Sequence, residues 1–303
     1  MTWGGRAEPR EGQTFGGDSR LVRYANFVKL PHTLFALPFA LLGVIVASYR
    51  YPVTGGTVAL VVLAFTCARF VAMGFNRIAD RDLDARNPRT RGRELVTGRL
   101  TLREAWVAVL LAAAGFVAAS WVLNPLCGGL SLPALLWIAT YSYAKRFTSW
   151  THLWLGLALA IAPVGGYLAV AGTWSEPWWV LLALTAAVTA WVAGFDVFYA
   201  LQDEDFDRAE RLRSLVVRLG RPRAIRAAKL LHGAAILALV GVGAGAALGG
   251  PYYAGVALGA GVIAWEHQLV KPDDLSRLDA AFFTANGLVS ILVFLGALVD
   301  RVW

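Results

Sequence analysis

The chain has 303 residues, of which 57% are hydrophobic and only 16% are charged; its mean hydropathy is +0.56 and its formal net charge is +8. These values exclude a soluble basic domain, so we expect no nucleic-acid partner, and they indicate a membrane protein. Cys67 and Cys127 both fall in apolar segments, which predicts neither a disulfide framework nor a cysteine-based metal site.

The first 22 residues are polar and Gly-rich and have no apolar core, so they do not form a secretory signal. We expect a disordered N-terminal arm over 1–22 and a single transmembrane domain over 23–303. Crossing about 30 Å of hydrocarbon takes roughly 20 helical residues. Nine apolar runs approach this length: 33–49, 57–75, 105–123, 127–143, 153–172, 178–198, 230–249, 251–267 and 280–299. The sequence therefore predicts an all-α, polytopic membrane protein with about nine transmembrane helices.

Basic residues concentrate in alternate connections between these runs. The connections 77–104 and 204–229 carry eight basic residues each, whereas 124–126 and 249–252 carry none. The positive-inside rule places the N-terminus and the charged connections in the cytoplasm. We therefore expect a multi-pass protein of the cell membrane whose acidic loops face the cytoplasm.

The segment GFNRIADRDLDARNPRTRGREL, residues 74–95, sets carboxylates among arginines directly after an apolar run. Asn76, Asp80 and Asp84 are spaced four residues apart. If the preceding helix continues through them, they share one face over about 12 Å. Asp82 lies two residues from each neighbouring Asp and is predicted to face away.

A second segment repeats this pattern. Tyr199, Asp203 and Asp207 have the same spacing, offset by 123 residues at all three positions. Asp196 lies seven residues before Asp203, and Arg69 lies seven before Asn76, so both are predicted to point into the same cavity. Two acid-bearing helix ends on one side of a bundle indicate a site between them.

Carboxylates and amide carbonyls are hard oxygen ligands that suit Mg²⁺, which proteins usually hold together with substrate phosphates. Two acidic patches beside arginine and lysine therefore predict a diphosphate site bridged by Mg²⁺. The alternative is that the acids are solvated loop residues paired with nearby arginines, and the matched spacing of two patches disfavours it. His232 and His267 lack ligand-spaced partners, so no zinc site is predicted.

The boxes NRIADRDLD and DVFYALQDEDFD resemble the signatures of the UbiA superfamily of intramembrane prenyltransferases. The likeness extends through HTLFALPFA, YSYAKRFT at 141–148 and RSLVVRLG at 213–220, and covers most of the chain beyond residue 23. DARNPRT and GREL look most like the branch of 4-hydroxybenzoate-type enzymes. Two positions depart from the pattern, because many members have Asp where this chain has Arg77, and the branch is expected to have Pro where this chain has Val96.

The resemblance implies nine helices around a central cavity, capped on the cytoplasmic side by the two Asp-bearing loops. It implies Mg²⁺-dependent transfer of a polyprenyl chain from polyprenyl diphosphate to an aromatic acid, 4-hydroxybenzoate or a dihydroxynaphthoate, in the biosynthesis of ubiquinone or menaquinone. The residues expected to hold Mg²⁺ are Asn76, Asp80, Asp84, Asp196, Asp203 and Asp207. Those expected to neutralise the pyrophosphate are Lys145, Arg146, Arg69 and Lys29, and those expected to face an allylic cation are Tyr141 and Tyr199.

Other functions stay open at this point. Members of the same superfamily attach chains to haem, chlorophyll precursors, homogentisate or phosphoribosyl diphosphate. A membrane transporter with charged cytoplasmic loops and a membrane-embedded scaffold are alternatives from other classes. Transporters tend to carry functional charge near the bilayer midplane, whereas the acids here follow helix ends.

Overall fold

The computed structural model describes residues 15, 19–278 and 280–303. Over these residues the protein is all-α, as the sequence predicts, and nine helices of 17 to 25 residues form its body. Each overlaps one of the predicted apolar runs. They are α2 (Leu30–Ser48), α3 (Gly55–Ala79), α5 (Leu102–Leu123), α6 (Pro125–Tyr141), α8 (Thr151–Ala171), α9 (Trp179–Ala200), α12 (Arg221–Gly245), α13 (Gly250–Leu269) and α14 (Asn286–Val302).

Six segments are long and apolar enough to cross a membrane: Gly55–Ala79, Leu102–Leu123, Thr151–Ala171, Trp179–Ala209, Arg221–Gly245 and Ala281–Val302. The apolar part of α2, Ala36–Ser48, and helix α6 are shorter. Among the described residues, length and composition thus support six crossings, and the predicted nine would also need the two shorter helices, α2 and α6, and the 20-residue helix α13.

Two helices begin elsewhere than the apolar runs suggest. Helix α12 starts at Arg221 rather than at 230, with Pro222 in its first turn and Gly220 before it at φ +74°. Proline suits the first turn because its missing N–H would be unsatisfied there anyway. The run at 280–299 divides into a π-helix, η2 (Ala280–Ala285), and α14. Hydropathy does not predict the start of α12, because its first turns are basic. Nor does it predict the π-helix, because hydropathy does not distinguish a π-helix from an α-helix.

Most of the predicted N-terminal arm lies outside the described residues, which include only Phe15 and 19–22 of it. The hydroxyl of Ser19 accepts the Val22 N–H at 3.3 Å and caps helix α1 (Arg20–Phe27). Residues 20–22 therefore belong to a helix rather than to the arm. Phe15 and Asn26 form two hydrogen bonds with each other, at 2.9 and 3.0 Å.

Glycines allow the closest helix contacts. A Cβ on Gly43 of α2 would lie 1.9 Å from the Pro163 carbonyl oxygen, and one on Gly166 of α8 would lie 2.2 Å from the Ala40 oxygen. Small residues let membrane helices pack backbone to backbone in this way. Helix α9 packs against α8 and α12, and 67% of its apolar window is buried, so it forms the centre of the bundle.

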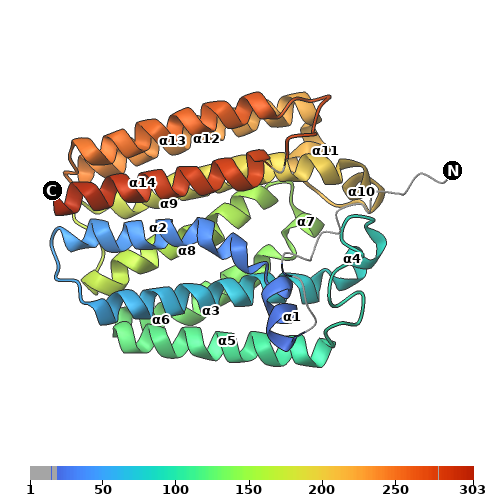
Figure 1. Ribbon diagram of the computed structural model, residues 1–303, viewed down its shortest axis with the longest axis horizontal. Coiled ribbons are helices and arrows are strands. Elements are labelled where there is room, and N and C mark those ends of the chain that lie inside the picture. The colour runs from blue at the N-terminus through green and yellow to red at the C-terminus, as the bar shows by residue number, and fades with distance from the viewer. Residues whose placement is uncertain (1–14, 16–18, 279) are drawn as a thin grey trace.

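Short helices occupy the charged connections. Helices α1, α4 (Arg81–Arg86), α7 (Ala144–Phe147), α10 (Glu204–Ala209) and α11 (Leu215–Leu219) gather at one end of the bundle, and the C-terminus lies at the other end (Figure 1). The fold thus brings together acidic and basic segments that are far apart in the sequence.

Candidate active site

A cavity of about 760 Å³ lies inside the bundle and extends to α4 and α10 at the charged end. All twelve residues that the sequence predicts for the site line it: Lys29, Arg69, Asn76, Asp80, Asp84, Tyr141, Lys145, Arg146, Asp196, Tyr199, Asp203 and Asp207. Asp82 is exposed and does not appear among the described lining residues.

The acidic boxes do not lie on single continuous helices, so that part of the prediction was wrong. Helix α3 ends at Ala79, and Asp80 links it to α4 with φ −100° and ψ 9°. Helix α9 ends at Ala200 and continues as a 3₁₀ turn, η1 (Leu201–Asp203), and Asp203 links this turn to α10 with φ −101° and ψ 6°. The two linking aspartates have nearly the same backbone angles, so the repeat in sequence is matched by a repeat in local structure. Each bend lets the later aspartate of its box, Asp84 or Asp207, be buried in the next helix.

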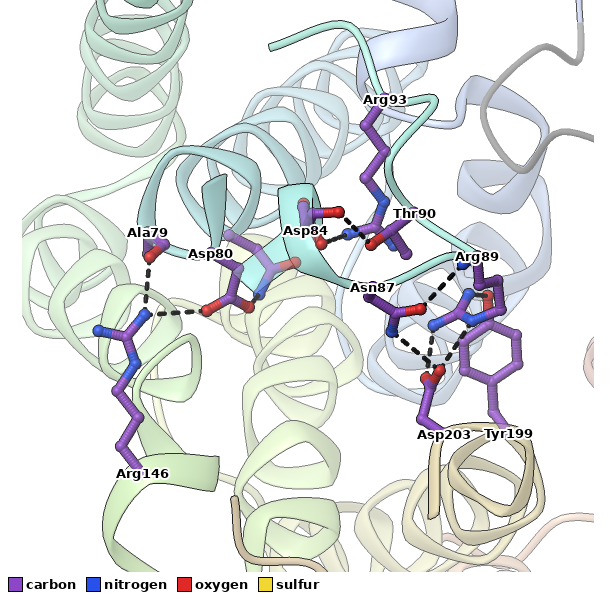
Figure 2. Close-up of polar contacts among 11 residues, drawn as sticks. Ala79, Asp80, Asp84, Asn87, Arg89, Thr90, Arg93, Arg146, Tyr199 and Asp203 are labelled. Atoms are coloured by element: carbon purple, nitrogen blue, oxygen red, sulfur yellow. Dashed lines mark hydrogen bonds and ion pairs between the residues drawn. The ribbon is translucent and has the colours of Figure 1, made fainter. Parts of the chain in front are cut away.

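Arginines from two other segments hold the first box (Figure 2). Arg146 of α7 donates to the Ala79 carbonyl at 2.7 Å and to Asp80 Oδ1 at 3.1 Å, while Asn76 Nδ2 donates to Asp80 Oδ2 at 3.1 Å. Arg93 Nη1 donates to Asp84 Oδ1 at 2.6 Å. Burial raises the pKa of the Asp80 carboxyl above its ordinary value, although Arg146 opposes the shift.

The loop after the first box reaches across to the second. Arg89 Nε donates to Asp203 Oδ1 at 2.9 Å, and Arg89 Nη2 pairs with the other carboxylate oxygen. Asn87 Nδ2 donates to Asp203 Oδ1 at 3.2 Å, and Arg89 Nη1 donates to the Tyr199 hydroxyl at 2.8 Å (Figure 2). This loop therefore closes the charged end of the cavity by joining the two boxes.

Lys145 lies 3.7 Å from Asp207 Oδ2, beyond hydrogen-bond distance. Burial lowers the pKa of the Lys145 amine, but the carboxylates, Asp207 first and then Asp203, outweigh it, so the pKa is raised above its ordinary value. Lys145 is thus held in its charged form beside the second box.

A second group of cations lines the cavity beside the first box. Arg77 is only 2% exposed, and none of its three side-chain nitrogens has a hydrogen-bond partner among the described residues. Burial, followed by the charges of Arg77, Arg93 and Arg69, lowers the pKa of the Lys29 amine well below its ordinary value. Basic side chains therefore gather on this wall, called here the cationic wall (Lys29, Arg69 and Arg77). Because a buried guanidinium is costly without a partner, the wall suits an anionic ligand.

Asp196 is paired with a residue that the sequence analysis missed. His152 Nδ1 lies 2.7 Å from Asp196 Oδ2, and His152 Nε2 accepts the Leu215 N–H at 3.3 Å. Since Nε2 acts as an acceptor, the ring proton is on Nδ1 and is donated to Asp196. His152 is fully buried and fixes this carboxylate at the cavity surface.

Aromatic rings form one side of the cavity, called here the aromatic wall: Trp191, Phe195, Tyr199 and Phe282. The ring centroids of Trp191 and Phe195 are 5.0 Å apart, those of Phe195 and Phe282 are 5.4 Å apart, and those of Phe282 and Tyr199 are 4.5 Å apart. The predicted Tyr199 is therefore one of several rings, and the Arg89 guanidinium already lies over it at 5.0 Å. The predicted Tyr141 also lines the cavity.

The residues suit a magnesium ion shared with phosphate. Among the described residues, no three His, Cys, Asp or Glu side chains come together as a ready-made metal site. The carboxylates are distributed among cations instead. Asp207 Oδ2, in a side chain that is nearly fully buried, has no hydrogen-bond donor in the described part of the chain. A carboxylate oxygen that accepts no hydrogen bond at a cavity wall can bind a hard cation. The carboxylates alone do not complete the coordination of such an ion, which fits Mg²⁺, because Mg²⁺ also takes phosphate oxygens as ligands.

A model of the UbiA prenyltransferase family matches residues 36–288. The chain belongs to the UbiA prenyltransferase family. It is therefore a transferase. The 4-hydroxybenzoate octaprenyltransferase of Methylobacillus flagellatus is 34% identical over 262 residues, which are 85% of this chain and 85% of that protein. That of Aromatoleum aromaticum is 33% identical over 231 residues, 75% of this chain and 76% of that protein.

Solved structures of the UbiA family share the fold. The apo structure of a UbiA homolog from Aeropyrum pernix K1 is 35% identical with a TM-score of 0.81, covering 89% of this chain and 98% of that one. A UbiA homolog from Archaeoglobus fulgidus bound to DMAPP and Mg²⁺ is 18% identical with a TM-score of 0.67, covering 92% and 99%. That homolog binds a prenyl diphosphate together with Mg²⁺.

Proposed function

We propose that this UbiA-family protein transfers a polyprenyl chain from polyprenyl diphosphate to an aromatic acid, with Mg²⁺ as cofactor. The observation that carries the proposal is the meeting of two acid boxes, their cationic partners and an apolar cavity at one place. In this proposal the diphosphate lies between Asp80 and Asp84 on one side and Asp203 and Asp207 on the other.

The carboxylates of both boxes, with the Asn76 amide oxygen, would hold the metal. When bound, Mg²⁺ withdraws charge from the diphosphate leaving group. Lys145 and Arg146 would neutralise the pyrophosphate, because they reach the same boxes from α7 and carry charge matched to phosphate oxygens. The aromatic wall and Tyr141 would face the allylic cation, whose charge is stabilised by ring faces.

The apolar end of the cavity supports a long donor chain. Leu130 of α6 and Leu157 of α8 line the cavity, yet they are 44% and 38% exposed on the surface of the bundle. We infer from this that the cavity opens sideways between α6 and α8, where a membrane would supply lipid. A prenyl chain that extends through this opening stays out of water along its whole length. Because each further prenyl unit is then also buried, the opening favours a polyprenyl donor over a short one.

The cationic wall supports an acceptor with a carboxylate. Its residues come from other segments than Lys145 and Arg146, which already pair with the acid boxes. The curated relatives are named for 4-hydroxybenzoate, an aromatic acid. We therefore assign the acceptor as 4-hydroxybenzoate or a dihydroxynaphthoate and the pathway as respiratory quinone biosynthesis. The cytoplasmic placement of the charged end follows from the distribution of basic residues.

One assay tests the function directly. Purified protein is given Mg²⁺, a labelled polyprenyl diphosphate and, in separate reactions, 4-hydroxybenzoate and dihydroxynaphthoates, and the product mass identifies donor and acceptor together. We expect one aromatic product and its loss in excess EDTA. Prenylation of neither acid would refute the acceptor, and full turnover in EDTA would refute the metal.

A further inference from the structure

Four polar side chains lie together behind the aromatic wall, on three helices of the bundle. They are Glu266 and His267 of α13, His232 of α12 and Asn286 of α14, called here the Glu266 cluster. Glu266 is 0% exposed, His232 1% and Asn286 2%. Ionisable groups inside a membrane domain are costly and usually have a function. None of these residues belongs to the acid boxes or to their cationic partners.

Hydrogen bonds connect the cluster to the central helix. His232 Nε2 lies 3.3 Å from the Trp191 carbonyl oxygen, so this nitrogen carries the ring proton. His232 Nδ1 is then an acceptor, and His267 Nε2, at 3.0 Å, donates to it. A Cβ on Gly194 would lie 2.3 Å from the His232 ring, so α9 leaves space for the ring at this position. The cluster therefore holds the α9 backbone at Trp191, where the aromatic wall begins.

The amide of Asn286 has one possible orientation. Its Nδ2 lies 3.2 Å from Glu266 Oε1, 3.0 Å from the Phe282 carbonyl and 3.3 Å from the Ala281 carbonyl. Exchanging the two amide atoms would place an oxygen against three acceptors. Both carbonyls belong to the π-helix η2, a type of turn that is frequent at functional sites. Glu266 thus secures, through Asn286, the turn that carries Phe282.

Phe282 is the part of this turn that reaches the cavity. Its ring packs on Tyr199 and Phe195, and both Phe282 and Asn286 line the cavity. If Asn286 lost its partner, the π-helix could relax, and the Phe282 ring would leave its place between the other two. The wall would then open toward the acid boxes, where the proposed donor ionises.

We propose that Glu266 is a positioning residue that holds Asn286 and the π-helix so that Phe282 shields the allylic cation from water. The proposal rests on the proposed function. Ionisation breaks the bond between the prenyl C1 and a diphosphate oxygen and leaves pyrophosphate and an allylic cation. An acceptor ring carbon then forms a C–C bond and loses its proton, or water forms the prenyl alcohol and loses a proton. Shielding favours the first outcome.

The test measures how the cation is divided between these outcomes. Glu266→Gln keeps the carbonyl oxygen that Asn286 needs, whereas Glu266→Ala removes it, and Phe282→Leu removes the ring. For each purified variant, prenyl alcohol and prenylated acceptor are quantified per pyrophosphate released. We expect Glu266→Gln to match the wild type, and Glu266→Ala and Phe282→Leu each to raise the alcohol-to-product ratio severalfold, because water then reaches the cation.

Tyr252→Phe is the matched control. Tyr252 is on the same helix, is fully buried and donates to the Leu239 carbonyl at 2.8 Å, yet it is not among the described lining residues. Its loss should lower the melting temperature and leave the ratio unchanged. An equal rise in Tyr252→Phe would show that the ratio reports general loosening, and a Glu266→Gln variant as defective as Glu266→Ala would show that charge matters instead. Either result would overturn the proposal.

Failure of the proposed acceptor gives a different result. If the wild type prenylates none of the aromatic acids, alcohol formation from the donor alone still reports the shielding. Glu266→Ala should then increase it and Glu266→Gln should not. Equal rates in both variants and the wild type would refute the positioning role.

Discussion

Removing one charge from each acid box tests whether the boxes form one site. Asp80 accepts hydrogen bonds from Asn76 and Arg146, and Asp203 accepts from Arg89 and Asn87. Asp80→Asn and Asp203→Asn keep the size of each side chain and remove its negative charge. If metal positioning supplies about 4 kcal/mol of transition-state stabilisation, each variant should lose roughly 10³-fold in turnover. Labelled donor and acceptor in a steady-state assay measure the loss.

The double variant gives the sharper result. Because both carboxylates would act on the same diphosphate, the Asp80→Asn, Asp203→Asn enzyme should be far less impaired than the product of the two single losses, as for residues that work as a unit. Fully multiplicative losses would mean that the boxes act independently. The Asp203 side chain is only 7% exposed in its pair with Arg89, so the melting temperature of each variant must be measured alongside turnover.

Two exposed aspartates provide controls at equivalent places. Asp82 follows Asp80 by two residues, and Asp205 follows Asp203 by two; both are exposed and neither is among the described residues that line the cavity. Asp82→Asn and Asp205→Asn carry the same change of charge and should lose little activity. If Asp82→Asn were as damaging as Asp80→Asn, or if Asp203→Asn kept full activity, the shared diphosphate site would be refuted.

Three further predictions concern orientation, the donor chain and packing. Cysteines at Arg91 and Glu176 should react with impermeant reagents from opposite sides of the membrane; labelling of both from one side would refute the topology. Ala134→Trp, at the opening between α6 and α8, should reduce turnover of long donors several-fold and leave a ten-carbon donor nearly unaffected; equal loss for both would exclude this exit. Gly166→Ala should cost about 1–3 kcal/mol, visible in thermal melts, because its Cβ would meet the Ala40 oxygen, while Gly165→Ala, which has open space, should not.

The sequence predicts those features that depend on local pattern. Each of the nine apolar runs overlaps one of the nine long helices, because the apolar residues of a helix that faces lipid or the core can be read from composition. The two boxes could be located because a four-residue spacing recurs after two of these runs. The bends at Asp80 and Asp203 were not predicted, because the spacing is also compatible with continuous helices. They nevertheless occur at equivalent positions of the repeat.

The sequence does not predict the partners of these acids. The segment after the first box contains Arg86, Arg89, Arg91 and Arg93 within eight residues, and nothing local distinguishes them. Arg89 is the one that joins the two boxes, because the loop brings it to Asp203, which is 114 residues away in the sequence. The role of His152 cannot be predicted from the sequence either, because its contact with Asp196 depends on how α8 packs against α9. Such pairs arise from tertiary packing, which hydropathy and spacing do not contain.

These ion pairs explain why arginines accompany the aspartates of the two boxes. Asp80, Asp84 and Asp203 each have an arginine partner, and Asp207 has Lys145 nearby. A carboxylate that binds a metal ion would release its arginine or lysine partner. That side chain could then bind a phosphate oxygen. Metal and diphosphate should therefore favour each other's binding, because each occupies the group that the other sets free.

This exchange of partners predicts a measurable coupling. Calorimetry with a non-hydrolysable donor analogue should show binding about 5–150-fold tighter in Mg²⁺ than in EDTA, and Mg²⁺ affinity should rise by the same factor when the analogue is present. Arg93→Met leaves Asp84 without its partner in the free enzyme, so the carboxylate should bind Mg²⁺ more readily without the analogue and the coupling should shrink. Equal coupling in the wild type and in Arg93→Met would show that the pairs persist in the bound state, and would contradict the exchange.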